Sequence, residues 1–377
     1  MTPLGLYVHV PFCAARCGYC DFNTYTAAEL PGGGDQAAFA TVALQELDHA
    51  AVTLGADARP AATVFFGGGT PTLLPPEELV AILEGIRQRF GLEPGAEVTT
   101  EANPESVGPR ALELLRASGF TRVSIGMQHA APHVLDTLDR VHTPGRAGAA
   151  VAEARAAGFE HVSLDLIYGA PGESADDWAL TLDTALAAGP DHVSAYGLEV
   201  EPGTALAARV RRGELGLPDG DAMADRQAEA DAAFSAAGLH WYEVANHAAS
   251  PRARCHHNLG YWRSHDWWGV GPGAHSHLAG ERWWNVRHPS AYARRLAAGR
   301  SPAAGRELLD AASRRFERIM LEVRLAEGLD TALLSPAGVR AAERLERDGA
   351  LELSGGRAVL TLHGRLTADA VVRQLTD

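Results

Sequence analysis

Hydrophobic and polar positions follow two alternating periods through the first half of the chain. Short runs rich in β-branched and aromatic residues predict strands at 6–10, 63–66, 97–100, 122–125, 161–167 and 192–198. Between them, apolar residues recur every three to four positions and predict helices at 35–54, 76–90, 109–117, 145–157 and 175–188. This alternation predicts an α/β fold whose parallel strands form either an open doubly wound sheet or a full or partial barrel.

Chemically distinctive residues come at or near the ends of these predicted strands. They are the cysteines that follow the first strand, the glycines at 67–69, Glu101, Gln128 and Asp165. Barrel enzymes build their active sites at the carboxyl ends of the strands. We therefore expect these residues to gather at one end of the fold.

The pattern changes after about residue 202. Residues 239–288 hold six of the seven tryptophans and eight of the sixteen histidines, which marks a specialised region. The last segment predicts helices at 307–325 and 336–347 and a hairpin of 350–353 with 358–362, as in a small winged-helix-like domain. We divide the chain into a barrel (1–215), a Trp/His-rich extension over the barrel (216–300) and this C-terminal domain (301–377).

Length and charge narrow the possible classes of protein. With 377 residues, 46% of them hydrophobic, the chain can bury one large core and a smaller one. The net charge of −14 and the mixed charges on the 336–347 helix argue against a nucleic-acid partner. No signal-like N-terminus and no run of about 18 apolar residues occur, so we expect a cytoplasmic protein without a transmembrane segment.

Three of the four cysteines lie within eight residues, as Cys13-x3-Cys17-x2-Cys20. In a reducing compartment such spacing predicts a ligand set, not a disulfide framework. Three thiolates on one short loop can each bind a different iron of a cubane and leave the fourth iron open. The alternatives are three unrelated thiols or a zinc site, but zinc takes four ligands and only His9 lies nearby.

This motif resembles that of the radical SAM superfamily, whose partial (β/α)6 barrel carries it after the first strand. The resemblance spans at least 4–198 and implies a [4Fe–4S] cluster on Cys13, Cys17 and Cys20, with S-adenosylmethionine (SAM) on the open iron. It also implies SAM contacts from Tyr7, Tyr19, Gly68, Gly69, Thr70, Glu101, Gln128 and Asp165. Glycines allow close backbone approach, and amide and carboxylate groups supply acceptors. A plain tight turn at 67–69 and ordinary packing of the two tyrosines are the alternative interpretations.

One residue departs from what the resemblance leads us to expect. His129 follows Gln128, where we expect relatives to have a small residue such as serine. The imidazole either perturbs the SAM pocket or points away from it.

The motifs together resemble the oxygen-independent coproporphyrinogen III oxidase family over nearly the whole chain. Oxidases of that family have a further cysteine two positions after the third ligand, where this chain has Phe22. Segments 20–23 (Cys-Asp-Phe-Asn) and 257–262 (His-Asn-Leu-Gly-Tyr-Trp) are instead similar to its haem chaperone (HemW-type) branch. Haem needs an axial imidazole or thiolate and flat aromatic walls, and the resemblance implies haem contacts from His257, Cys255, Asn258, Tyr261 and Trp262.

The sequence thus predicts a chaperone that binds haem, a [4Fe–4S] cluster and SAM. The resemblance implies that it passes haem to an acceptor haem protein, which can be membrane-associated. It also implies that the protein lacks coproporphyrinogen oxidase activity. Two alternatives remain open: an oxidase that decarboxylates porphyrinogen propionates, and a radical SAM enzyme acting on an unrelated small molecule. The alternative interpretation of the Trp-rich stretch is purely structural: it packs against the barrel's open side while its histidines face solvent.

Overall fold

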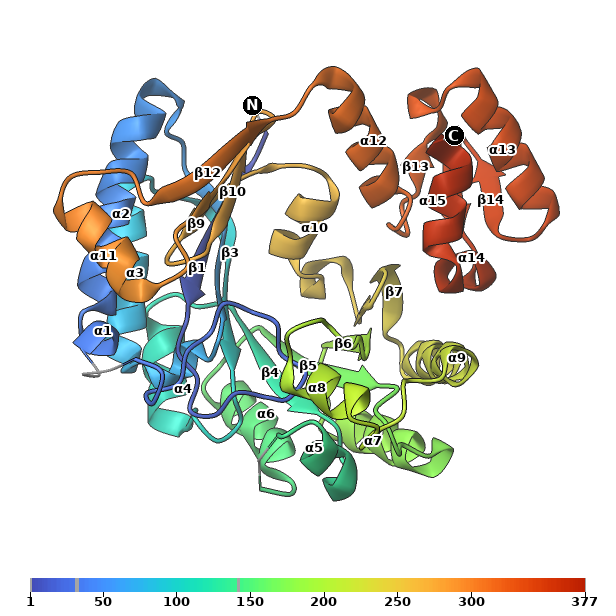
Figure 1. Cartoon of the computed structure of the whole chain (residues 1–377), viewed down its shortest axis with the longest axis horizontal. Coiled ribbons are helices and arrows are strands. Elements are labelled where there is room, and N and C mark those ends of the chain that lie inside the picture. The colour runs from blue at the N-terminus through green and yellow to red at the C-terminus, as the bar shows by residue number, and fades with distance from the viewer. Residues whose placement is uncertain (1, 31–33, 141–142, 377) are drawn as a thin grey trace.

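The computed structural model describes residues 2–30, 34–140 and 143–376. A large curved sheet organises the chain (Figure 1). Its strands are β1 (Leu4–Val10), β2 (Ala61–Gly68), β3 (Leu92–Ala102), β4 (Arg122–Gln128), β5 (His161–Tyr168), β6 (His192–Gly197), β7 (His240–Glu243), β8 (Asn246–Ala248), β9 (Asp266–Val270), β10 (His275–Leu278), β11 (Glu281–Asn285) and β12 (Ala303–Leu308). Across the described residues the order is β12-β11-β10-β9-β1-β2-β3-β4-β5-β6-β8-β7.

Strands β1 to β6 are parallel and lie in chain order. A doubly wound sheet would reverse its strand order at a switch point, so the predicted partial barrel is confirmed. The sheet continues through β9, parallel to β1, and β10 to β12 on one side, and through antiparallel β8 and β7 on the other.

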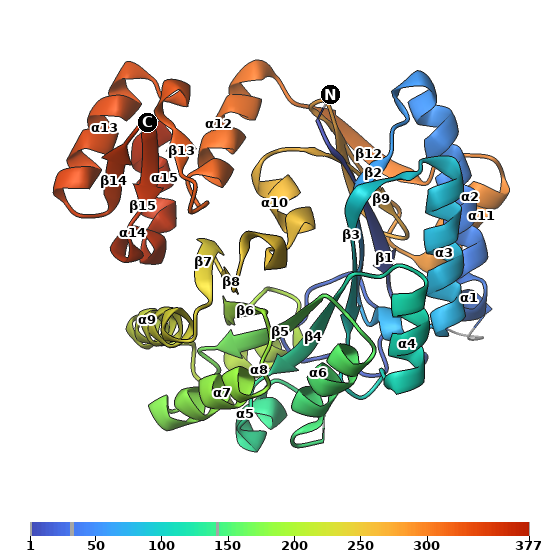
Figure 2. The same cartoon turned by 180° about the vertical axis from the view of Figure 1, so that it is seen from behind.

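The barrel helices cover the convex side of this sheet (Figure 2). They are α1 (Gly34–Ala37), α2 (Phe39–Leu54), α3 (Pro76–Arg89), α4 (Pro109–Ala117), α5 (Pro132–Thr137), α6 (Arg146–Ala156) and α7 (Ala175–Ala187). The buried faces of α2, α3, α4, α6 and α7 and of the strands share one hydrophobic core, which includes Leu47, Ile82, Leu115 and Trp178. Helix α4 matches its prediction, whereas the single helix predicted at 35–54 is interrupted at Ala38.

The region after residue 202 is richer in structure than its pattern indicated. It contains α8 (Ala205–Arg211), α9 (Gly220–Ala236), α10 (His256–Trp262) and α11 (Pro289–Ala297). Helix α10 lies on the concave side of the curved sheet, in the opening between β3 and β7 (Figure 1). The barrel is therefore closed on that side by a helix from the Trp/His-rich segment.

A buried carboxylate joins the β9–β11 extension to the barrel. Glu46 of α2 accepts hydrogen bonds from the Gly271 backbone N–H (2.7 Å), from Asn285 Nδ2 (2.7 Å) and from the Tyr292 hydroxyl. Burial raises the pKa of Glu46 to about 7. Three donors on one buried carboxylate fix the extension against α2, because each would otherwise be buried without a partner.

The C-terminal unit has a separate hydrophobic core, which includes Ile319, Leu345 and Val371. It is built from α12 (Ala311–Glu322), β13 (Leu329–Asp330), α13 (Pro336–Arg347), β14 (Leu351–Ser354), β15 (Arg357–Leu360), α14 (Leu362–Leu366) and α15 (Ala368–Thr376). Helix α13 and the β14–β15 hairpin match the prediction. The helix predicted at 307–325 begins only at Ala311, because Ala303–Leu308 pairs with β11 as strand β12. No helix among the described residues is both long enough and apolar enough to cross a bilayer.

Candidate functional site

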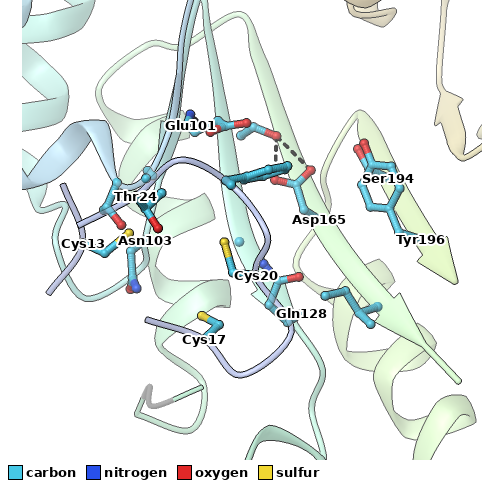
Figure 3. Close-up of a pocket in the computed structure, with 18 of the residues that line it drawn as sticks. Cys13, Cys17, Cys20, Thr24, Glu101, Asn103, Gln128, Asp165, Ser194 and Tyr196 are labelled. Atoms are coloured by element: carbon cyan, nitrogen blue, oxygen red, sulfur yellow. Dashed lines mark hydrogen bonds between the residues drawn. The ribbon is translucent and has the colours of Figure 1, made fainter. Parts of the chain in front are cut away.

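The carboxyl ends of β1 to β6 surround a cavity of about 1020 Å³. Its walls include the cysteine loop after β1, the glycine turn after β2, and the polar ends of β3 to β6 (Figure 3). Every residue predicted to hold the cluster or SAM lines this cavity: Tyr7, Cys13, Cys17, Tyr19, Cys20, Gly68, Gly69, Thr70, Glu101, Gln128 and Asp165. Residues up to 158 positions apart in the chain are thus brought to one end of the barrel, as the strand-end argument predicts.

The cysteine loop is held in place by backbone hydrogen bonds. The N–H of Cys13 donates to the carbonyl of Tyr25 (3.0 Å), and that of Gly18 donates to the carbonyl of Leu138 (2.9 Å). All three thiols are partly buried, and burial raises the pKa of Cys13 and Cys20. Bound iron would favour the thiolate forms of Cys13 and Cys20, which burial disfavours.

The donor set suits a cubane better than a single ion. Within the described residues, no three His, Cys, Asp or Glu side chains converge as ligands of one metal ion. A cubane needs no such convergence, because each thiolate binds a different iron. His9, the one nearby fourth ligand for zinc, is buried, with its Nδ1 3.0 Å from the Tyr7 hydroxyl and its Nε2 2.9 Å from the Asn23 carbonyl oxygen.

The glycine turn lies directly against the cysteine loop. A Cβ on Gly69 would lie 2.5 Å from the carbonyl oxygen of Phe12 and 3.0 Å from Cys13 Sγ. Gly68 has a φ of 111°, and a Cβ there would lie 2.5 Å from His9 Nδ1. Both positions require glycine, because only a residue without a side chain fits this close approach. The turn and the loop therefore form one cradle.

Two carboxylates stand across the cavity from the sulfurs. Glu101 Oε2 accepts the N–H of Gly68 (3.0 Å), and both oxygens of Asp165 lie 2.9 Å from the Ser124 hydroxyl. Burial, with the neighbouring charge of Asp165, raises the pKa of Glu101 to about 8; burial also raises the pKa of Asp165. A bound cation such as an ammonium group would be favoured here, since it would restore the ionised carboxylates.

Gln128 ends β4 in a conformation unusual for a side-chain-bearing residue. Its φ is 66°, at an irregularity in the β4–β5 register. The bend aims Gln128 into the cavity (Figure 3). His129 turns the other way: it is fully buried beside Trp178 at a ring separation of 6.2 Å and accepts the N–H of Ala131 (3.0 Å). Of the two alternatives for His129, the second is therefore correct: its imidazole points away from the SAM pocket.

Sequence reasoning missed three residues of this site. Arg140 Nη1 lies 3.6 Å from Cys17 Sγ, and its Nη2 donates to the carbonyl of Gly126 (2.9 Å). Ser194 and Tyr196 line the cavity from the end of β6. The strand-end rule could have identified the two β6 residues, but nothing in the local pattern around Arg140 indicates that its guanidinium reaches the cysteine loop.

Helix α10 lines the same cavity near the amino ends of β2 and β3. Its first turn is held by Glu97, whose carboxylate accepts the N–H groups of His256 and His257 (2.9 Å each). The His257 ring is buried, with Nδ1 2.8 Å from the Thr63 hydroxyl and Nε2 2.8 Å from the Tyr261 hydroxyl. Burial lowers the pKa of His257 to about 3. Both ring nitrogens therefore have partners within the protein.

The other predicted haem contacts divide between the cavity and the interior. Cys255, Asn258 and Tyr261 line the cavity together with His257, whereas Trp262 does not. Cys255 is buried, its Sγ lies 3.7 Å from Glu97 Oε1, and burial holds the pKa of its thiol well above the usual range. Trp262 packs against the small cluster of Tyr242, Ala248, Ala253, Leu259 and Leu325.

Comparisons with known proteins agree with this fold and site. A profile of the Radical SAM superfamily matches residues 7–185, and one of the HemN C-terminal domain matches 309–367. The fold superposes on the coproporphyrinogen III oxidase HemN of Escherichia coli with a TM-score of 0.84 at 22% identity, covering 100% of this chain and 90% of that chain. Fold and site together define a protein of the radical SAM class.

Comparison with curated relatives identifies a narrower family within this superfamily. The chain is 55% identical over 373 residues to the heme chaperone HemW of Mycobacterium tuberculosis strain H37Rv, covering 99% of this chain and 95% of that protein. It is 34% identical to the heme chaperone HemW of E. coli K12, covering 87% and 84%. The chain belongs to the HemW family of the radical SAM superfamily.

Proposed function

We propose that the protein is a haem chaperone that carries a [4Fe–4S] cluster and SAM and delivers haem to an acceptor protein. One observation carries this proposal: the 55% identity to a heme chaperone over 99% of the chain. The fold alone would suit the oxidase equally, since HemN shares it at only 22% identity. The activity must therefore be argued from residues and tested directly.

The radical SAM family implies a cluster and SAM, and the cavity fits both. Cys13, Cys17 and Cys20 would hold three irons of the cluster. When bound, the cluster supplies an electron that can cleave the sulfonium C–S bond of SAM. The chain's own residues supply complementary charges: Glu101 and Asp165 can accept hydrogen bonds from an ammonium group or ribose hydroxyls, and Arg140 can pair with a carboxylate.

The remaining predicted contacts serve to orient this ligand. Gly68, Gly69 and Thr70 offer backbone at close range, and Gln128 offers an amide from the opposite wall. Tyr7 and Tyr19 border the cavity with aromatic rings. We assign all six to SAM binding.

We propose that haem, the cargo, contacts the α10 segment. This segment supplies Cys255, His257, Asn258, Tyr261 and Trp262, and it borders the cluster cavity on one side. An aromatic, partly apolar surface is the environment that a porphyrin ring prefers. The Trp/His-rich extension at 216–300 would then form the haem region, between the barrel (1–215) and the winged-helix-like domain (301–377).

The oxidase is the competing activity. In that family the position two residues after the third ligand is cysteine, and here Phe22 occupies it with 62% of its surface exposed at the cavity rim. We propose that the protein lacks coproporphyrinogen oxidase activity. It would act in the cytoplasm and deliver haem to a haem-binding acceptor, which can be membrane-associated. Nucleic acid would not be among its partners.

One pair of assays tests the proposal. Anaerobically reconstituted protein should bind haem stoichiometrically and transfer it to an acceptor apoprotein. The same preparation, given SAM, a reductant and coproporphyrinogen III, should release no carbon dioxide. Porphyrinogen turnover at an enzymatic rate would overturn the chaperone assignment and favour the oxidase.

A further inference from the structure

The cluster cavity extends to the opposite end of the barrel. Arg122 and His192, the first residues of β4 and β6, line it there. Cys255, His257 and Asn258 of the α10 segment complete this end, which we call the floor. Because the cysteine loop follows the carboxyl end of β1, the floor lies at the end of the cavity away from the cluster.

Arg122 is a buried cation at this floor. Only 1% of its surface is exposed, and its Nη1 donates to the carbonyl of Ala253 (2.7 Å). Its Nη2 is buried and has no hydrogen-bond partner in the part of the chain that the structure describes, where Arg122 also forms no ion pair. Buried arginines are almost always paired with an anion. The floor therefore lacks a partner for this guanidinium.

The nearest acidic groups are committed to other donors. Glu97, Asp165 and Asp191 interact with Arg122 only at longer range. The Glu97 carboxylate accepts two N–H groups of α10 (2.9 Å each), and Asp165 accepts a serine hydroxyl (2.9 Å). Asp191 pairs with Arg155 (2.9 Å). An anion for Nη2 of Arg122 must come from a ligand.

The other polar groups of the floor differ in availability. His192 and His257 are hydrogen-bonded at both ring nitrogens. Asn258 is half-buried, and its side-chain amide forms no hydrogen bond within the described residues. Arg122 and Asn258 are therefore the donors that remain for a ligand. A carboxylate suits them, because its two oxygens accept several hydrogen bonds and carry the opposite charge.

SAM and haem both carry a carboxylate, but that of SAM belongs at the other end of the cavity. There it would bind the open iron beside Arg140, whose Nη2 donates to the carbonyl of Gly126 (2.9 Å). Gly126 lies four positions after Arg122 on β4, which separates the two by about 13 Å along the strand. A SAM molecule held by the cluster would keep its carboxylate away from the floor.

Aromatic rings wall the cavity beside the floor. The rings of Phe65 and His257 stack at a centroid separation of 5.2 Å, and Tyr261 meets His257 edge to face at 4.9 Å. Tyr7 stacks on Phe65 at 6.2 Å. All four residues line the cavity. Such a wall favours a flat apolar ring, and a porphyrin combines that ring with carboxylate substituents.

We propose that the floor of the cluster cavity is a carboxylate site, where Arg122 Nη2 and the Asn258 amide bind a propionate of haem. This inference rests on the proposed haem chaperone function and specifies how the cargo is held. Arg122 and Arg140 then divide the two carboxylate ligands between the ends of β4: Arg140 binds that of SAM, and Arg122 binds that of haem.

Titration of the anaerobic, cluster-loaded protein with hemin and with hemin dimethyl ester, both without SAM, tests this site. The wild type should bind hemin about tenfold or more tightly than the diester, as expected for hydrogen bonds to a charged group. Arg122→Gln should bind hemin no more tightly than the diester, whereas Arg122→Lys, which keeps the charge, should retain part of the preference. SAM affinity, measured by calorimetry, should be the same in Arg122→Gln as in the wild type.

Arg87→Gln is the matched control. Arg87 is also partly buried and donates to a backbone carbonyl, that of Ser118 (2.6 Å), but it does not line the cavity. This variant should keep the wild-type preference for hemin over the diester.

Two results would overturn the carboxylate site while leaving the chaperone intact. The first is equal affinity of the wild type for hemin and its diester, a result that does not depend on the folding of any variant. The second is an unchanged preference for hemin in folded Arg122→Gln protein; a loss of SAM affinity in that variant would then assign Arg122 to the carboxylate of SAM. Failure of the wild type to bind hemin at all would instead overturn the chaperone proposal, and this site with it.

Discussion

Replacing Gly69 by alanine should separate the glycine turn from the cysteine loop. The new Cβ would lie 2.5 Å from the carbonyl oxygen of Phe12, 2.9 Å from its carbonyl carbon and 3.0 Å from Cys13 Sγ. To reach a van der Waals separation of about 3.5 Å, the two backbone segments must move apart by about 1 Å. The movement also strains the hydrogen bonds from Gly69 N–H to Val10 and from Thr70 N–H to Phe12, both 2.8 Å.

The energetic cost can be bounded. Forcing extra atoms into a packed site typically costs about 1–3 kcal/mol. Phe12 is only 4% exposed, so the strained carbonyl cannot simply turn into solvent. We expect Gly69→Ala to destabilise the cluster-free protein by about this amount and to lower the iron content, because Cys13 is displaced with Phe12.

The assay combines denaturant unfolding of the cluster-free protein with iron and sulfide analysis after anaerobic reconstitution. Gly216→Ala is the matched control: its Cβ would have no neighbour within 4 Å, and its φ is not positive. That change should leave stability equal or slightly higher. Gly69→Ala protein with wild-type stability and full iron occupancy would refute the claim that the turn and the loop form one cradle.

Two further changes probe the same cavity, and a third probes how its cysteine loop is attached to the β9–β11 extension. Burial raises the pKa of Glu101 to about 8, so SAM affinity should rise about tenfold per pH unit up to that pH as the carboxylate ionises. The Glu101→Gln variant should flatten this pH dependence, which calorimetry between pH 6.5 and 8.5 measures. An unchanged slope in the variant would exclude Glu101 as the titrating group. Arg140→Ala removes a cation 3.6 Å from Cys17 Sγ, so the cluster's reduction potential should fall and the cluster should become harder to reduce. An unshifted midpoint potential in an EPR-monitored redox titration would contradict this. Asn23→Ala removes the amide that donates to the carbonyls of Pro272 (3.0 Å) and Arg287 (2.8 Å). This loss should lower the free energy of unfolding by about 1–3 kcal/mol, as measured by denaturant unfolding. Wild-type stability in the variant would show that Asn23 does not tie the cysteine loop to the extension.

Local pattern predicted much of the barrel and its cofactor end. Strand and helix periods depend on neighbouring residues, so β1 to β6 and α4 could be found from the chain alone. The Cys13-Cys17-Cys20 loop is a local motif as well, and the carboxyl ends of parallel strands must converge whatever the packing. For these reasons Glu101 and Asp165 could be assigned to one cavity before any coordinates.

Tertiary structure alone decided the surroundings of that cavity. Arg140 reaches Cys17 across 123 positions of sequence, and no periodicity encodes such a contact. The short strands β7 to β12 form through pairing that local sequence does not encode: β8 and β9 pair with the edge strands β6 and β1, and the others pair with these two or with one another. His256 and His257 are adjacent in sequence, yet His256 is exposed and His257 is buried between Thr63 and Tyr261. Side chains of neighbouring residues on a helix point in different directions, so only the packing of α10 in the barrel determines which imidazole is exposed.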